Sequence, residues 1–439
     1  MAKVSKQQPK VEFNSSAQTG ALLRLKVSRA LAFVVVVLPA VLIFGVGFIG
    51  YKIGNHATSP SVTANKSDLL TPGNSNSGAL RSGAWGTLAA HAITLQIPDE
   101  YLKTTANPIR TNSRWVFKGF SRNRILNLFA SAGLSAEELR TLSATNYWQV
   151  MTNQIVITPP HSVVLGLTPQ ARSIIYTVLA QFPENALQHS PFFWKTKDEA
   201  AFFSNPDLSE PAKTLIRQMS YQKGNLTAFA DLETLIATLQ GSEAELVKIL
   251  KPLSAKPATL AKLQITPETD MDAMVRYWGV GGLTKVMEPA LEAVTRIPRG
   301  RTVTFLAVLP QFARQRLNIY PGSQDNDGMD GIWTAFNFFA NALEATNTAP
   351  SFWGEKLNTD YFSVFTDPRY GDVLIISRPT GEVVQAGVYL ADDLVFTRIG
   401  STRWDPWTIM TVADLQEVSG LRLEHQEIPT ISYYRNRSF

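Results

Sequence analysis

The sequence contains no cysteine among its 439 residues and only five histidines. The absence of cysteine excludes disulfide bonds, thiolate metal sites and a lipid-modified cysteine, and it excludes a cysteine nucleophile. With 45% hydrophobic and 18% charged residues, the chain is able to form hydrophobic cores, and its length is sufficient for two or three domains.

Basic residues are concentrated at the N-terminal end. The formal net charge is +5, but residues 1–52 contain seven Lys and Arg against a single acidic residue, Glu12. The rest of the chain contains 34 basic and 35 acidic residues. Because this part is nearly neutral, it lacks the basic surface that binds polyanions, and we expect no nucleic-acid partner.

One segment, residues 30–51, carries no charge over 22 residues. At about 1.5 Å per residue, a helix of this length crosses a hydrocarbon layer of ~30 Å. Arg24, Lys26 and Arg29 precede it, which favours a cytoplasmic N-terminus. We therefore predict a single-pass helix in a bacterial inner membrane, with the lipid bilayer as a partner and the C-terminal domains outside the cytoplasm. A cleaved signal peptide fits less well, because a long basic region precedes the segment and no A-x-A motif follows it.

Composition also divides the rest of the chain. Asn, Ser, Thr, Gly and Pro are frequent after the apolar segment, which indicates a flexible spacer. Farther on, Ser135 begins a capping-box sequence, Thr168-Pro169 marks another helix start, and no repeat of constant period is evident. We predict a basic cytoplasmic tail, a transmembrane helix, the spacer, a mainly helical domain and a C-terminal α+β domain, with the bounds 1–29, 30–51, 52–84, 85–298 and 299–439.

The last part of the chain combines a helix with short strands. A β-branched apolar run at 301–309 predicts a strand, and a helix is expected from about 332 to 345. Further strands are expected at 372–377, 383–390 and 394–397. A helix followed by an antiparallel meander is an α+β order.

Two segments of this part carry a resemblance to a known family. One is the helix start Asp330-Gly331-Ile332-Trp333, and the other is Val384-Gln385-Ala386-Gly387-Val388-Tyr389, which follows a Gly-Asp strand entry. Together they resemble the papain-like cell-wall hydrolases of the NlpC type, here in a bacterial membrane-anchored protein. The resemblance implies a papain-like helix plus antiparallel sheet, with a nucleophilic cysteine at the helix start and a histidine base in the strand. In this sequence those two positions are Gly331 and Gln385.

Neither residue can perform that chemistry, because glycine has no side chain and glutamine does not titrate. The predicted fold class is α+β, with an N-terminal transmembrane helix, an α-helical middle domain and a C-terminal papain-like domain that lacks catalytic residues. We expect a binding or scaffold module at the cell envelope that holds a peptide, glycan or protein near Gly331, Trp333 and Gln385. The alternative is an active envelope hydrolase, a peptidase or amidase, whose nucleophile lies elsewhere.

Two further motifs have competing interpretations. Asp325, Asp327 and Asp330 partly match a calcium loop, but the same cluster suits a solvated turn. We expect no cofactor, with calcium as the alternative. Trp404 and Trp407, together with Trp333, are candidate ligand-binding residues, because exposed tryptophans form platforms for sugars or peptides. The alternative is that Trp404 and Trp407 pack a loop onto the sheet.

Overall fold

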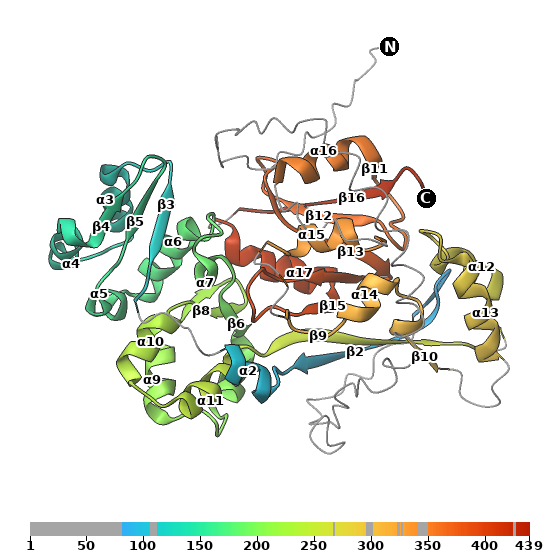
Figure 1. Cartoon of the computed structure of the whole chain (residues 1–439), viewed down its shortest axis with the longest axis horizontal. Coiled ribbons are helices and arrows are strands. Elements are labelled where there is room, and N and C mark those ends of the chain that lie inside the picture. Colours follow the sequence, from blue (N-terminus) through green and yellow to red (C-terminus); the bar gives the residue numbers. More distant parts are fainter. Residues whose placement is uncertain are drawn as a thin grey trace, which may run out of the picture. The chain divides into compact units, whose positions relative to one another are not determined.

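The computed structural model describes residues 81–105, 112–266, 268–295, 302–322, 325, 328–340, 350–424 and 427–439. Helices and antiparallel sheets alternate along this part of the chain, which is an α+β arrangement (Figure 1). The predicted tail, the segment 30–51 and nearly all of the spacer lie outside the described residues.

The predicted fold class requires a correction concerning the membrane. It included an N-terminal transmembrane helix, yet within the described residues no helix is long and apolar enough to cross a membrane. The described fold is therefore α+β without a spanning helix. The segment 30–51, on which that prediction was based, is not among the described residues.

The largest sheet has six strands in the order β11-β16-β12-β13-β14-β15, and every pair is antiparallel. Its strands are β11 (Tyr361–Val364), β12 (Val373–Ser377), β13 (Val383–Ala391), β14 (Leu394–Arg398), β15 (Trp407–Thr411) and β16 (Thr430–Asn436). The strands predicted at 372–377, 383–390 and 394–397 are thus confirmed to within one residue at each end.

A helix covers each face of this sheet. Successive side chains of a strand point to opposite faces, and in β12 Val373 and Ile375 belong to the core that contains Trp333 of α15 (Gly331–Asn337). Leu374 and Ile376 belong to a second core, which contains Leu415 and Val418 of α17 (Val412–Ser419). The alternation explains why β12 is apolar from Val373 to Ile376 and why all five of its residues are buried.

A second sheet joins residues that are far apart in the sequence. Strand β2 (Gly86–Leu95) pairs with β9 (Lys256–Gln264) over nine residues, from Thr87 opposite Gln264 to Leu95 opposite Lys256. Strands β1 (Arg81–Gly83) and β10 (Thr302–Thr304) complete the order β1-β2-β9-β10. The strand expected at 301–309 is therefore shorter than predicted, because the 3-10 helix η3 (Phe305–Ala307) follows β10 directly.

The middle of the chain is not an α-helical domain, which is the second correction to the predicted fold class. It contains two three-stranded antiparallel sheets, β3-β5-β4 and β6-β8-β7. The first is built with α3, α4, α5 and α6, and its elements are β3 (Trp115–Lys118), α3 (Arg122–Ser131), α4 (Ala136–Leu142), β4 (Trp148–Val150), β5 (Gln154–Ile157), α5 (His161–Gly166) and α6 (Pro169–Leu179).

The second sheet repeats this succession of elements. After α7 (Ala186–His189) come β6 (Phe192–Lys195), α8 (Glu199–Phe203), α9 (Glu210–Met219), β7 (Tyr221–Lys223), β8 (Leu226–Phe229), α10 (Leu232–Leu239) and α11 (Glu243–Leu253). Equivalent backbone hydrogen bonds close both units: Gly119 N–H donates to Asn153 O at 3.4 Å, and Thr196 N–H donates to Asn225 O at 2.8 Å. The middle region is therefore a tandem repeat of one β-α-α-β-β-α-α unit.

Local sequence determines where several of these helices begin. Ser135 and Glu138 form the complete capping box ahead of α4, as predicted. Thr168 accepts a hydrogen bond from Ala171 N–H, and Pro169 occupies the first turn of α6. These caps satisfy the amide groups at the helix start that have no partner within the helix.

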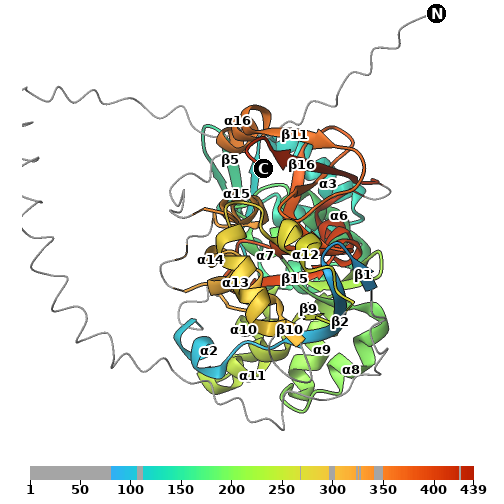
Figure 2. The same ribbon diagram turned by 90° about the vertical axis from the view of Figure 1, so that its right-hand side faces the viewer.

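The remaining helices are α2 (Asp99–Thr105), α12 (Met271–Trp278), α13 (Thr284–Thr295), α14 (Gln311–Arg316), α16 (Pro350–Asp360) and the 3-10 helices η1 (Thr145–Tyr147), η2 (Thr196–Asp198) and η4 (Gly420–Arg422). Helices α12 and α13 lie beside the end of the β2/β9 ladder that carries β10 (Figure 2). Trp278 of α12 donates from Nε1 to Trp85 O at 3.0 Å, and both Trp278 and Leu88 join the core of Trp333. The hydrophobic core thus extends across residue 298, where we predicted a domain boundary.

Candidate functional site

Gly331 and Gln385 are in direct contact. Gly331 is the first residue of α15, Gln385 lies on β13, and both are buried. A Cβ atom at position 331 would overlap Gln385 Oε1 and would lie 2.6 Å from Ala386 O and 2.9 Å from Gln385 Cδ. Carbon atoms in contact are normally about 3.5–4.0 Å apart, so any side chain at 331 would displace Gln385. The structure therefore brings together the two positions that the family resemblance pairs.

The amide of Gln385 is held on both sides. Its Nε2 donates to Ile399 O at 2.6 Å and approaches Arg398 O at 3.4 Å, and its Oε1 accepts from Ala386 N–H at 3.0 Å. Only 2% of Gln385 is exposed. A neutral amide with its polar atoms bonded in this way can neither take a proton from a nucleophile nor reach a ligand in solvent.

Two buried arginines fix the backbone around this contact. Arg422 donates to Val384 O at 2.8 Å, to His189 O at 2.9 Å and to Ile399 O at 3.0 Å. Ile399 O is thus shared between Arg422 and Gln385. Burial lowers the pKa of the Arg422 guanidinium from its ordinary value, against the opposing effect of Asp330 and Asp405. A guanidinium has no acceptor site and remains protonated, so Arg422 acts as a structural clamp.

Arg398 has the same role in the next loop. It donates to Asp405 O at 3.0 Å, to Thr402 O at 2.8 Å and to Met329 O, just before α15. Its guanidinium also lies 4.7 Å from the centre of the Trp407 ring. Because its donors are directed at backbone carbonyls, Arg398 fixes the loop between β14 and β15 and has little capacity left for an anionic ligand.

Asp330 precedes the contact and caps α15. Its side chain accepts from Trp333 N–H at 2.9 Å. Burial raises the pKa of this carboxyl above its ordinary value, while the bond from Trp333 and the charge of Arg422 act in the opposite direction. The carboxyl is committed to the helix start, which gives it a structural role.

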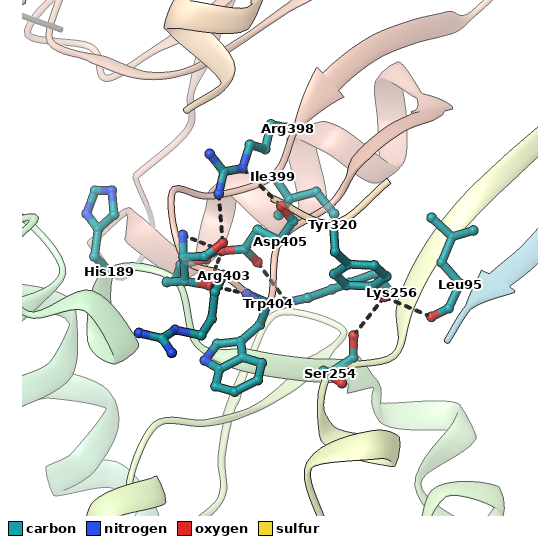
Figure 3. Close-up of polar contacts among 12 residues, drawn as sticks. Leu95, His189, Ser254, Lys256, Tyr320, Arg398, Ile399, Arg403, Trp404 and Asp405 are labelled. Carbon is teal, nitrogen blue, oxygen red and sulfur yellow. Dashed lines mark hydrogen bonds and ion pairs between the residues drawn. The ribbon is translucent and has the colours of Figure 1, made fainter. Parts of the chain in front are cut away.

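A buried ion pair lies next to these residues (Figure 3). Lys256 Nζ is 3.1 Å from Asp405 Oδ1, and their side chains are 1% and 0% exposed. Asp405 Oδ2 accepts from Ser190 Oγ at 2.8 Å and from Thr402 Oγ1 at 2.5 Å. Burial acts to raise the pKa of Asp405, but Lys256 and the hydroxyls outweigh it, so the pKa lies below its ordinary value. The sequence offered no signal for this pair, because 149 positions separate its members.

None of the described histidines provides a base at this site. His189 Nδ1 is 2.7 Å from Ala180 O, and burial lowers the pKa of its imidazole to about 3. His161 Nδ1 is 3.1 Å from Thr234 Oγ1, but Thr234 is 0% exposed and is out of reach of a substrate. His91 lies on β2, and His56 and His425 fall outside the described residues.

The three tryptophans predicted as ligand-binding residues are buried. Trp333 is 0%, Trp407 1% and Trp404 6% exposed. Trp407 Nε1 donates to Thr334 Oγ1 at 2.9 Å, and the Trp404 ring packs 6.0 Å from that of Phe192. They belong to the interior and present no aromatic platform to solvent, which corrects that prediction.

Two carboxylates of the alternative calcium loop are engaged in other contacts. Asp325 accepts from Gly322 N–H at 2.7 Å and pairs with Arg316 at 3.4 Å, and Asp330 caps α15. Asp327 lies outside the described residues. Within the described ranges no three His, Asp or Glu side chains are grouped so that they could hold a metal ion.

A groove that the sequence did not reveal lies in the tandem repeat. Helix α6, the end of α9 and strand β7 line a space of about 910 Å³, and Lys223 is one of the lining residues. Ile174 of α6 lines this groove and is 43% exposed.

Comparison of the chain with models of known protein families, with curated proteins and with solved structures finds no match. The Gly331–Gln385 contact and the groove at Lys223 are therefore the features from which a function can be proposed. The contact is closed and its polar atoms are bonded, whereas the groove is open to solvent.

Proposed function

We propose that this protein is a binding or scaffold protein of the cell envelope, with a papain-like C-terminal domain that has no catalytic residues. The observation that carries the proposal is the contact between Gly331 and Gln385. In papain-like hydrolases the cysteine opens a helix and its base lies on a neighbouring strand, within hydrogen-bond reach. Here the corresponding residues also meet, at the start of α15 and on β13, but they contribute neither a nucleophile nor a base.

Packing at this contact supports a structural role in place of catalysis. The position of a nucleophile side chain is filled by the amide of Gln385, and the surrounding carbonyls are bonded by Arg398 and Arg422. A substrate carbonyl would have to displace Gln385 to reach Gly331. Loss of the reactive groups together with closure of the space favours binding elsewhere on the molecule.

The architecture is tested by restoring the two catalytic side chains. Because the chain has no cysteine, a Gly331→Cys substitution introduces a unique thiol whose alkylation by iodoacetamide can be followed against pH. In the double variant Gly331→Cys/Gln385→His, we expect a thiol pKa at least one unit below the ordinary value of about 8.5, because a neighbouring imidazolium stabilises the thiolate. In Gly331→Cys alone, no imidazolium lies beside the buried thiol, so we expect a pKa above that of the double variant.

Identical alkylation profiles for the single and double variants, both shown to be folded by circular dichroism, would refute the papain-like arrangement. Gly420→Cys provides the control, because a Cβ atom at position 420 meets no other atom within 4 Å and the thiol has no designed partner.

The absence of catalysis is tested separately with the unmodified protein. We expect no release of products from cell-wall fragments or from a mixed peptide substrate above the rate in buffer. Hydrolysis by the wild-type protein would contradict the proposal and would favour the alternative of an envelope hydrolase with a different nucleophile.

The envelope location is a prediction from the basic residues before 30–51 and the uncharged residues within that range. We expect the full chain to sediment with membranes and a chain that begins at residue 53 to remain in the supernatant. Equal distribution of the two chains would remove the envelope from the proposal.

A further inference from the structure

The groove in the tandem repeat has the dimensions of a ligand site. Its volume of about 910 Å³ lies within the range of roughly 300–1,000 Å³ that is typical of pockets for small molecules. One wall is α6, and the other is formed by α8 and by the β7–β8 hairpin with the end of α9 before it. The site thus lies where the last helix of the first repeat meets the second repeat.

Apolar side chains from both repeats line part of the groove. Ile174 and Val178, one helical turn apart on α6, both line it, and Ile174 is 43% exposed. Phe203 of α8 and Tyr221 of β7 add aromatic surface from the other repeat. An exposed isoleucine at the wall of a pocket gains free energy when an apolar ligand removes it from water, at about 25 cal/mol per Å².

One of the polar residues that line the groove, Lys223, has no carboxylate partner. Lys223 ends β7, and its ammonium donates to Thr177 Oγ1 at 2.5 Å and to Leu421 O at 3.2 Å. In the described part of the chain, no ion pair joins it to Asp or Glu. An ammonium has three donors, so one remains for a ligand. Burial, assisted by Arg378, lowers the pKa of Lys223 to about 8.

The other charged residues that line the groove are one cation and two carboxylates. Arg217 stacks its guanidinium 4.1 Å from the centre of the Phe203 ring, and Glu199 and Glu424 also line the groove. Gln181 Nε2 is 3.5 Å from Glu424 Oε1. A buried charge that lacks an opposite charge is costly, and a ligand that supplies one recovers part of that cost. Lys223 is therefore the position in the groove at which an anion gains most.

We propose that this groove binds a small amphiphilic carboxylate, with the carboxylate on Lys223 Nζ and the apolar chain along Ile174 and Val178. The inference is independent of the papain-like proposal, because the groove is built almost entirely from residues 169–227. Ligand binding in the groove would therefore neither support nor weaken the papain-like proposal. The same holds for a lack of binding.

The test uses the full chain, with decanoate as the probe and 1-decanol as the neutral ligand of equal chain length, in calorimetric titrations at pH 7. We expect decanoate to bind at least tenfold more tightly than 1-decanol. We expect Lys223→Met to reduce the affinity for decanoate at least tenfold and to leave the affinity for 1-decanol within about a factor of two.

Two further variants make the result specific. Lys248→Met removes an exposed lysine on α11 that does not line the groove, and it should bind decanoate as the wild type does. Ile174→Glu places a like charge at the apolar wall and should abolish decanoate binding, with little effect on folding because the residue is exposed. If Lys223→Met does not fold, decanoate binding by Ile174→Glu still tests whether the ligand occupies the groove. Equal affinities for the two ligands, or unchanged decanoate binding in either groove variant, would refute the proposal.

Discussion

Lys256 and Asp405 form an ion pair in the interior, 3.1 Å apart, although they lie on β9 and in the loop between β14 and β15. Ser190, which follows α7, bonds to the same carboxylate. Strand β9 follows the tandem repeat in the sequence and pairs with β2, which precedes it. The loop between β14 and β15 belongs to the six-stranded sheet. One carboxylate thus links three regions of the chain that are distant in sequence.

Loss of one partner from this pair should be costly. We expect Lys256→Met to reduce the free energy of unfolding by about 3–5 kcal/mol, because Asp405 would remain buried without its cation. Lys103→Met, which breaks an exposed pair with Glu100, should reduce the free energy of unfolding far less. Urea denaturation of both variants measures the difference. Adding Asp405→Asn to Lys256→Met should restore part of the loss, and equal costs for the two lysine variants would contradict a buried role.

A methyl group at position 331 should destabilise the protein. Gly331→Ala places Cβ 2.6 Å from Ala386 O and against Gln385 Oε1, so we expect a loss of about 1–3 kcal/mol from strain. Gly420→Ala is the matched control, because its backbone is helical with φ −56° and nothing lies within 4 Å of a Cβ atom there. It should change stability by less than about 0.5 kcal/mol in the same urea titration.

The clash at 331 should also be coupled to Gln385. In the double variant Gly331→Ala/Gln385→Ala, the shorter side chain leaves room for the new methyl group. We expect the double variant to be more stable than the sum of the two single effects predicts, by at least about 1 kcal/mol. Strict additivity would show that the two residues do not share the space that the structure assigns to them.

Acid should weaken the fold through His189. Its pKa is about 3 in the folded protein against an ordinary value of 6.5, so between these values the unfolded chain binds a proton that the folded chain does not. The contribution of neutral His189 to the free energy of unfolding is therefore fully present above pH 6.5 and is lost as the pH falls toward 3. Between pH 7 and pH 5 this loss is about 2 kcal/mol. Urea denaturation at both pH values should show a smaller loss in His189→Asn, whereas His91→Asn, at an exposed position, should retain the wild-type loss.

Decanoate binding should depend on pH through Lys223. Its pKa of about 8 is depressed chiefly by burial and then by Arg378, against the raising effect of Glu427 and Glu424. The ammonium is therefore largely present at pH 7 and largely absent at pH 9.5, where we expect the affinity for decanoate to be at least tenfold lower. Binding of 1-decanol should change little over the same range. A decanoate affinity that is constant to pH 9.5 would show that Lys223 does not hold the carboxylate.

Local signals in the sequence were sufficient for part of this structure. The capping box at Ser135 and the cap at Thr168 predict helix starts correctly, since both depend on residues within one turn. The three strands from 373 to 398 were recognisable because each is mainly an apolar run, and a Pro-Thr-Gly turn separates the first two. The juxtaposition of positions 331 and 385 followed from the family resemblance, and periodicity alone would not have indicated it.

Features that depend on distant residues could not be predicted in this way. The pairing of β2 with β9 joins positions more than 150 residues apart, and no local pattern identifies the partner of a strand. The tandem repeat was missed because its two units differ in loop and helix length and in side chains, so the spacing between equivalent elements is not constant. Burial of Trp404 and exposure of Ile174 likewise depend on tertiary packing.

Strand β16 lies between β11 and β12, although it is made of residues 430–436. During synthesis on a ribosome, β12 can form its hairpin with β13 early, but its other edge remains open until residue 436 has left the exit tunnel. An open edge with the sequence Val-Leu-Ile-Ile is a surface that chaperones recognise and that aggregation exploits. A nascent chain stalled at residue 425 should therefore be protease-sensitive in this sheet and resistant in the tandem repeat, which requires nothing beyond residue 253 for its own strand pairs.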